Sequence, residues 1–209
     1  MSLRIITSDA CVAEGVTWLC AHDPKMAEAY AQTGPLPLRL KPDGFGEVLS
    51  AIMSQQVSVA SANAIMQRLR DAQMIDAHSI KATDEETLRA LGLSRQKARY
   101  AKALAEADID YIALRQSSTD DVLKTLTSVT GVGVWTAEIY AKFSLGHADV
   151  FAAGDLALQE AAKVLYDLPE RPKERAMRQM AEQWQPWRSV AARQLWAYYR
   201  VIKDREGIT

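Results

Sequence analysis

Residues 129–137 read Val-Thr-Gly-Val-Gly-Val-Trp-Thr-Ala. Gly131 and Gly133 flank a single valine, and because glycine lacks a Cβ the backbone can turn tightly there and take up positive φ. A Ser118-x-x-Asp121 capping box opens a helical pattern before this stretch, and apolar residues at helical spacing follow it as far as Gly146. The sequence therefore predicts a helix, a tight hairpin and a second helix. The hairpin amides and the second helix's N-terminus direct partial positive charge at one place, which predicts an anion site.

The composition describes an ordinary globular protein. The chain has 209 residues, enough for one domain or for two small lobes with a sizeable buried core, and is 48% hydrophobic and 24% charged. No apolar run approaches 18 residues, and no basic region followed by an apolar core opens the chain, so we expect no membrane span, no signal peptide and a cytoplasmic location. Cys11 and Cys20 are the only cysteines, which excludes a four-cysteine iron–sulfur cluster.

Basic residues are concentrated in one segment, although the formal net charge is only −1. Between Glu86 and Glu106 there are five basic residues and no acidic one: Arg89, Arg95, Lys97, Arg99 and Lys102. Arg95, Arg99 and Lys102 share one face of a helix that begins near Ser94. This run is either a solvated helix face or a set of phosphate contacts, and both interpretations stay open.

The rest of the chain predicts an all-α fold of about ten helices. Residues 3–7 form either a short strand or an apolar arm, and the prolines in 33–44 make that segment a connector. Thr83-Asp84-Glu85-Glu86 is predicted to be a capping box. His147, beside Gly146, is expected to be a surface turn residue. Further helix starts are expected at Ser8, Pro24, Phe45, Ser58, Pro172 and Pro186.

The hairpin, with Asp155 eighteen residues beyond it, resembles the helix-hairpin-helix DNA glycosylases, and most closely their 3-methyladenine DNA glycosylase II family. Three further stretches fit in the family's order: 52–60 (Ile-Met-Ser-Gln-Gln-Val-Ser-Val-Ala), 92–98 (Gly-Leu-Ser-Arg-Gln-Lys-Ala) and 186–189 (Pro-Trp-Arg-Ser). The resemblance implies a single glycosylase domain with two helical lobes and the active-site cleft between them. One lobe would span about 45–148, and the other 1–44 with 149–209.

Asp155 has two interpretations. A carboxylate after a glycine and before an apolar helix is an ordinary N-cap. The resemblance makes it the catalytic carboxylate, and one residue can do both. Cleavage of an N-glycosidic bond builds positive charge on the deoxyribose, which a fixed carboxylate stabilises. An alkylated base leaves readily, so no second carboxylate is needed, and Asp149 is expected to be structural.

The residues of the substrate pocket also follow from the resemblance. Trp135 stands where bifunctional relatives carry a nucleophilic lysine, which implies a monofunctional enzyme that leaves an abasic site. Lys124 and Lys142 bracket the hairpin and are not expected to reach the sugar, since Lys142 lies two turns beyond Trp135, ~10 Å along the helix. Trp135 and Trp196 are either core residues or stacking surfaces for the flipped base. Ile139 and Leu156 replace aromatic residues of some relatives in the same pocket.

The resemblance further implies a DNA-binding surface. Gln56 matches the wedge that fills the gap left by an extruded base. The main-chain carbonyls of Thr127, Val129 and Val132 match a monovalent cation site. The remaining DNA contacts are expected from Gly131, Val132, Gly133, Thr136, Gln55, Ser58, Arg95 and Lys97.

We therefore predict a monofunctional DNA glycosylase that removes alkylated bases of the 3-methyladenine type from duplex DNA in base excision repair. It is expected to act as a monomer, near the nucleoid if the source is bacterial, and without a cofactor. One alternative is a glycosylase for deaminated or oxidised bases. The other is a non-catalytic helix-hairpin-helix DNA-binding module.

Overall fold

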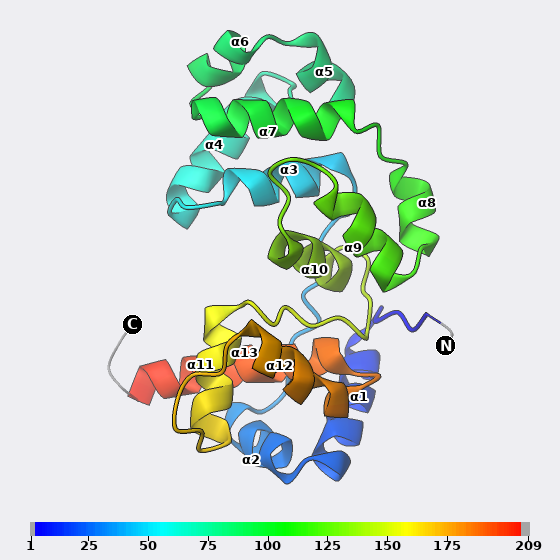
Figure 1. Ribbon diagram of the computed structural model, residues 1–209, viewed down its shortest axis with the longest axis vertical. Coiled ribbons are helices and arrows are strands. Elements are labelled where there is room, and N and C mark those ends of the chain that lie inside the picture. The colour runs from blue at the N-terminus through cyan, green and yellow to red at the C-terminus, as the bar shows by residue number, and fades with distance from the viewer. Residues whose placement is uncertain (1–2, 206–209) are drawn as a thin grey trace. The chain divides into compact units, whose positions relative to one another are not determined.

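The computed structural model describes residues 3–205. The chain divides into two compact units, which we call the inserted unit (residues 41–140) and the terminal unit (residues 1–40 with 141–209). The expectation from the sequence places these boundaries near residues 45 and 148. In Figure 1 the inserted unit runs from cyan to green, and the terminal unit is blue at its start and yellow to red at its end.

Within the described residues, the regular structure consists of thirteen α-helices and one 3₁₀ helix. The all-α prediction is confirmed, but the predicted number of about ten is too low. The inserted unit contains α3 (Phe45–Met53), α4 (Val59–Asp71), α5 (Ala77–Ala82), α6 (Glu85–Ala90), α7 (Arg95–Glu106), α8 (Tyr111–Gln116), α9 (Thr119–Thr127) and most of α10 (Val134–Phe143). The terminal unit contains α1 (Asp9–His22), α2 (Pro24–Thr33), α11 (Leu156–Leu165), α12 (Glu174–Ala181), η1 (Glu182–Trp184) and α13 (Arg188–Arg205).

Serine caps set four of these helix starts, as the sequence predicts. Ser8, Ser58, Ser94 and Ser118 each have extended backbone, and each side chain accepts a hydrogen bond from the amide three residues on. The predicted capping box at Thr83 is wrong by one residue. Asp84 is the N-cap of α6 and accepts from the Thr87 amide at 2.7 Å.

Two short helices, α5 and α8, have no counterpart in the sequence prediction. Each has six residues, too few to develop an apolar period, and an aspartate begins each of them. Asp76 accepts from the Ser79 amide, and Asp110 accepts from the Ile112 and Ala113 amides. A side-chain cap, and not an amphipathic stripe, therefore identifies these helices.

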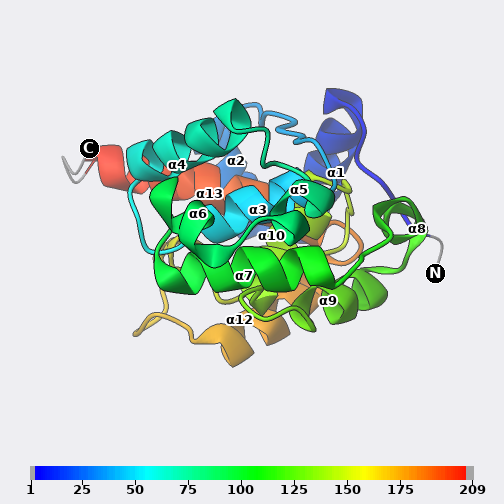
Figure 2. The same cartoon turned by 90° about the horizontal axis from the view of Figure 1, so that it is seen from above.

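In the inserted unit, α7 is the central element and packs against α3, α5 and α6 (Figure 2). Its buried face consists of small and aliphatic residues, among them Ala98, Ala101 and Leu104. The facing stripe of α3, Val48, Leu49 and Ile52, is also buried, as its helical spacing predicts.

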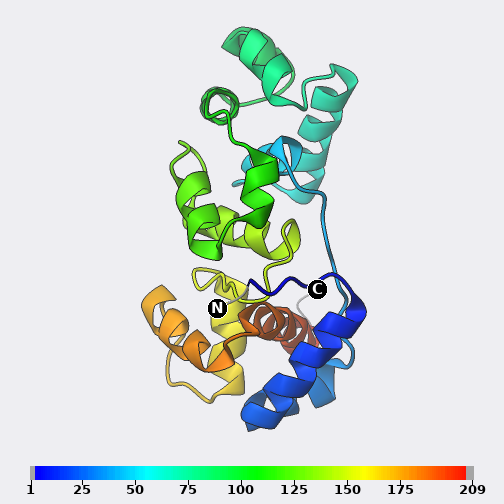
Figure 3. The same cartoon turned by 90° about the vertical axis from the view of Figure 1, so that its right-hand side faces the viewer.

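In the terminal unit, α13 packs against α1, α2 and α11, and Figure 3 shows it nearly end-on. The Asp23 carboxylate ties this unit together. Its Oδ1 accepts from the Lys25 and Met26 amides at the start of α2. Its Oδ2 accepts from the Tyr166 hydroxyl at 2.5 Å and from the Trp184 indole at 3.0 Å. A nearly buried carboxylate is stable here because four donors replace its water.

The segment predicted as a strand or an arm forms one isolated bridge, between Ile5 and His147. His147 is fully buried, so the surface position expected for it is wrong. Burial lowers the pKa of its imidazole to about 4. None of the helices in residues 3–205 has the length and apolar character that crossing a membrane would require.

Candidate functional site

Asp155 is the N-cap of α11, in the terminal unit. Its Oδ1 accepts hydrogen bonds from the amides of Ala157 at 2.9 Å and Leu158 at 3.1 Å, and from the indole N–H of Trp196 at 3.1 Å. The first two bonds are those of an ordinary helix cap. The third comes from a residue forty-one positions away on α13. The carboxylate is therefore oriented by two helices.

The loop that carries Asp155 is fastened to the start of α13 by the Pro-Trp-Arg-Ser stretch. Arg188 pairs with Asp149 through Nε to Oδ1 at 2.6 Å and Nη2 to Oδ2 at 2.9 Å. Ser189 is fully buried, and its Oγ lies 2.5 Å from the His147 carbonyl oxygen and 3.0 Å from that of Val150. Asp149 thus has the structural position that the sequence analysis gives it.

Trp196 lies among aromatic and basic side chains of the same unit. The Phe143 ring stacks on it, with 5.7 Å between centroids and 24° between planes. Lys142 is fully buried, and its Nζ lies 4.4 Å from the Trp196 ring centroid. The separation of Trp135 and Lys142 along the helix axis does not indicate this contact, because it does not include the direction in which the lysine side chain packs. Lys142 is thus a neighbour of the Asp155 site, enclosed by rings.

In the hairpin the two glycines differ. Gly131 has φ of +97°, and a Cβ built on it would lie 2.3 Å from Cγ of Tyr100 on α7. Gly133 is not among the residues with positive φ, and a Cβ there would meet no atom within 4 Å. The prediction of positive φ therefore holds for Gly131 and is wrong for Gly133. The Gly133 carbonyl accepts from the Ala137 amide as α10 begins.

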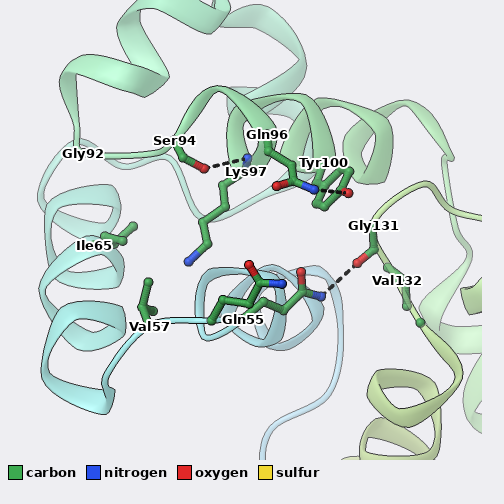
Figure 4. A pocket seen from close by; sticks show the side chains of 12 residues that line it. Gln55, Val57, Ile65, Gly92, Ser94, Gln96, Lys97, Tyr100, Gly131 and Val132 are labelled. Atoms are coloured by element: carbon green, nitrogen blue, oxygen red, sulfur yellow. Dashed lines mark hydrogen bonds between the residues drawn. The ribbon is translucent and has the colours of Figure 1, made fainter.

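A hollow of about 690 Å³ lies in the inserted unit where the hairpin, the α3–α4 turn and the start of α7 meet. Figure 4 shows Gln55 reaching across to the hairpin, where its Nε2 donates to the Gly131 carbonyl at 2.9 Å. Lys97 points into the hollow from α7, and Gln96 donates to the Tyr100 hydroxyl. The structure therefore brings three stretches that the sequence singled out separately to one surface.

Gln56 lies at the apex of the turn between α3 and α4. It is exposed and has φ of +57°, a left-handed conformation that is uncommon for a residue with a side chain. Its neighbours Ser54, Val57, Ser58 and Val59 are also exposed, and Ser58 caps α4. This apex is where the sequence analysis places the wedge.

The basic residues of α7 separate into two kinds. Arg95 and Arg99 are exposed. Lys102 donates to three carbonyl oxygens near the end of α5, those of Ile80, Lys81 and Thr83. Lys102 therefore has a structural role, which is neither of the two interpretations that the sequence leaves open for this run.

Lys97 both donates to a main-chain carbonyl and faces the hollow. Its Nζ donates to the Met53 carbonyl at 2.5 Å, and burial lowers the pKa of its amine. It also lines the hollow. An ammonium has three donors, so one bond to a carbonyl leaves donors for a ligand.

The other predicted residues also divide between the units. Trp135 is 45% exposed on α10 of the inserted unit, and Leu156 is 61% exposed on α11 of the terminal unit. Ile139 is half-buried. Thr136 is buried as a whole residue, so little of it is open to the DNA contact expected from it.

The predicted cation ligands lie where α9 ends and the hairpin begins. The Val129 carbonyl accepts from the Val132 amide at 3.0 Å. Within residues 3–205, no cluster of three or more histidine, cysteine or acidic side chains could hold a metal ion. A cation bound at the hairpin of the inserted unit would therefore have main-chain oxygens as its ligands.

The chain is similar to known proteins in sequence and in fold. Residues 49–186 match the family model described as the HhH-GPD superfamily base excision DNA repair protein. The chain is 32% identical over 165 residues to DNA-3-methyladenine glycosylase 1 of Schizosaccharomyces pombe, covering 75% of this chain and 72% of that protein. The chain is also similar to the structure of the 3-methyladenine DNA glycosylase Mag1 of that yeast in complex with abasic DNA. The TM-score is 0.76 and the sequence identity 29%, over 88% of this chain and 95% of that chain. The structure of a DNA-3-methyladenine glycosidase from Bacillus halodurans has a TM-score of 0.83 and 28% sequence identity, over 98% of this chain and 95% of that chain.

Proposed function

We propose a DNA glycosylase activity on alkylated bases of the 3-methyladenine type for this chain, which belongs to the HhH-GPD superfamily of base excision DNA repair proteins. The partner in this proposal is duplex DNA that carries a damaged base. The protein would act on it as a monomer, in the compartment that holds the DNA. The observation that carries the proposal is the Asp155 carboxylate, whose Oδ1 accepts hydrogen bonds from two helix amides and from the Trp196 indole.

The proposed role of Asp155 is electrostatic. As the bond between base and deoxyribose breaks, the sugar becomes an oxocarbenium-like cation, and a carboxylate held beside it lowers the energy of that state. The same carboxylate can orient the attacking water and accept its proton. Because a carboxylate already held by three donors needs no reorganisation during the reaction, its charge is available at full effect.

The inserted unit would hold the DNA backbone. In this proposal the amides of the hairpin and the N-terminus of α10 bind a phosphate, and Gln56 fills the stack where the base has been extruded. The exposed indole of Trp135 offers a stacking surface for a base. The carbonyls of Thr127, Val129 and Val132 would hold a monovalent cation, which would supply positive charge for the phosphate. A carbonyl has two lone pairs, so the bond from the Val132 amide leaves the Val129 oxygen able to bind it.

The direct test is base release from a panel of duplexes. Methylated DNA, and duplexes with one uracil, hypoxanthine or 8-oxoguanine, are incubated with the protein, and free bases are separated by chromatography. We expect release of methylated purines. Release of only deaminated or oxidised bases would favour the other glycosylase assignment. Binding to every duplex without release would favour a non-catalytic module.

A second expectation concerns strand cleavage. Trp135 cannot form a Schiff base, and the buried Lys142 amine is enclosed by the rings of Phe143, Phe151 and Trp196. Borohydride should therefore trap no covalent protein–DNA adduct on methylated DNA, and strand breaks should form only after alkali. An adduct would contradict the monofunctional assignment, and its loss in Lys142→Met would identify the lysine.

The basic residues of α7 provide a test of the DNA surface. If Arg95 and Arg99 contact phosphates, Arg95→Gln or Arg99→Gln should each lower the slope of log affinity against log salt by about one. Lys102→Gln is the matched control on the same helix. It should leave the slope unchanged and lower the unfolding midpoint, because three carbonyls lose their donor. Unchanged slopes in both arginine variants would show that α7 presents a solvated face.

A further inference from the structure

The terminal unit has a basic hollow that no predicted DNA contact accounts for. Arg39, Phe143, Arg193, Trp196 and Arg200 line it, together with Pro37. On α13 the residues Arg193, Trp196 and Arg200 follow at intervals of three and four, which places them on one helix face. The hollow therefore gathers three arginines and Trp196, whose indole donates to Asp155.

Arg193 serves as the internal support of this cluster. It is nearly buried, and its Nη1 donates to the Ser189 carbonyl at 3.2 Å. Its Nε and Nη2 both donate to the Leu38 carbonyl, at 3.4 and 3.2 Å. This arginine ties the segment that carries Arg39 to α13. Arg39 itself has φ of +50°, so the tertiary contacts hold its backbone in an uncommon conformation.

The charged side chains that line the hollow are all arginines. Burial, with a smaller contribution from the charge of Arg39, lowers the pKa of Arg193 to about 10. Throughout the described part of the chain, no carboxylate forms an ion pair with Arg39, Arg193 or Arg200. Like charges gathered in this way repel one another until an anion joins them.

We propose that Arg39 and Arg200 bind a backbone phosphate of the DNA strand that carries the damaged nucleotide. Both side chains are exposed, and a planar guanidinium matches a phosphate in a two-point hydrogen bond. Trp196 lines the hollow and donates to Asp155, so the phosphate would be one that flanks the nucleotide being cleaved. The terminal unit then has a phosphate contact of its own. This inference rests on the proposed glycosylase function.

The test measures binding of the full chain to a duplex with an uncleavable tetrahydrofuran abasic analogue over a range of salt concentrations. Because both arginines neutralise one phosphate, the double variant Arg39→Gln/Arg200→Gln should lower the salt slope by about 0.9, and each single variant by part of that. Arg200→Lys keeps the charge and should keep most of the slope. Arg175→Gln is the control, since Arg175 is an exposed arginine of α12 outside the hollow.

Slopes equal to wild type in both glutamine variants would overturn the phosphate site, as would an equal loss in Arg175→Gln. The readout needs no base release, so the two proposals can fail separately. If the wild-type chain releases no base but the glutamine variants show the slope changes, only the glycosylase function is contradicted. A wild-type chain that binds no duplex overturns both.

Discussion

Replacing Asp155 with asparagine is expected to lower the rate of base release at least about a hundredfold, ~3 kcal/mol of transition-state stabilisation. Asparagine keeps the size of the side chain and an oxygen that can accept from the Ala157 and Leu158 amides and the Trp196 indole. The helix cap and the fold therefore survive, and only the negative charge is lost. Single-turnover release of methylated purines measures the effect, and affinity for abasic duplex should persist.

This substitution separates the two interpretations of Asp155. If the residue were only a cap, asparagine would serve equally well, and release would stay within a few-fold of wild type. Asp149→Asn is the matched control, with the same change of charge six residues earlier. It should loosen the pair with Arg188, lower the unfolding midpoint and lower base release far less than Asp155→Asn does. Equal losses in both variants would point to damage to the loop.

The sequence predicts those features of the fold that depend on neighbours in the chain. Ser58 and Ser94 cap the helices that follow them, because capping needs only a side chain and an amide three residues on. The apolar stripe of α3 is buried as its spacing predicts. The helices α5 and α8 are missed because six residues develop no period.

Features that depend on distant packing could not be predicted in this way. Spacing and the resemblance indicate Asp155, but its bond to Trp196 joins residues forty-one positions apart. Lys142 and His147 both become buried through contacts between elements, which charge or position in a turn does not indicate. Helical spacing groups Lys102 with Arg99. The Lys102 amine nevertheless donates to three carbonyls about twenty residues earlier in the chain, which helical spacing does not indicate.

Gly131→Ala is expected to destabilise the inserted unit by about 3 kcal/mol, since an alanine there is both strained and overpacked. Its φ is +97°, and its Cβ would lie 2.3 Å from Cγ and 2.7 Å from Cβ of Tyr100. The Tyr100 Cβ cannot rotate away, so the hairpin or α7 must move. Urea unfolding measures the loss, and Tyr100→Ala in the same chain should restore part of it, because it removes the contacts with Cγ and Cδ2 and leaves only that with Cβ. Wild-type stability of Gly131→Ala would contradict the packing argument.

Gly133→Ala should behave differently, although the two glycines are only two residues apart. Its φ lies outside the left-handed region, and its Cβ would meet nothing within 4 Å, so stability should change by less than about 0.5 kcal/mol. The protein does not need a glycine there, but a phosphate that approaches the hairpin closely does. We therefore expect Gly133→Ala to weaken binding to damaged and undamaged duplexes alike, because phosphate contacts carry no sequence information. Unchanged affinity for both would remove Gly133 from the DNA surface, and a loss confined to damaged DNA would place it at the lesion.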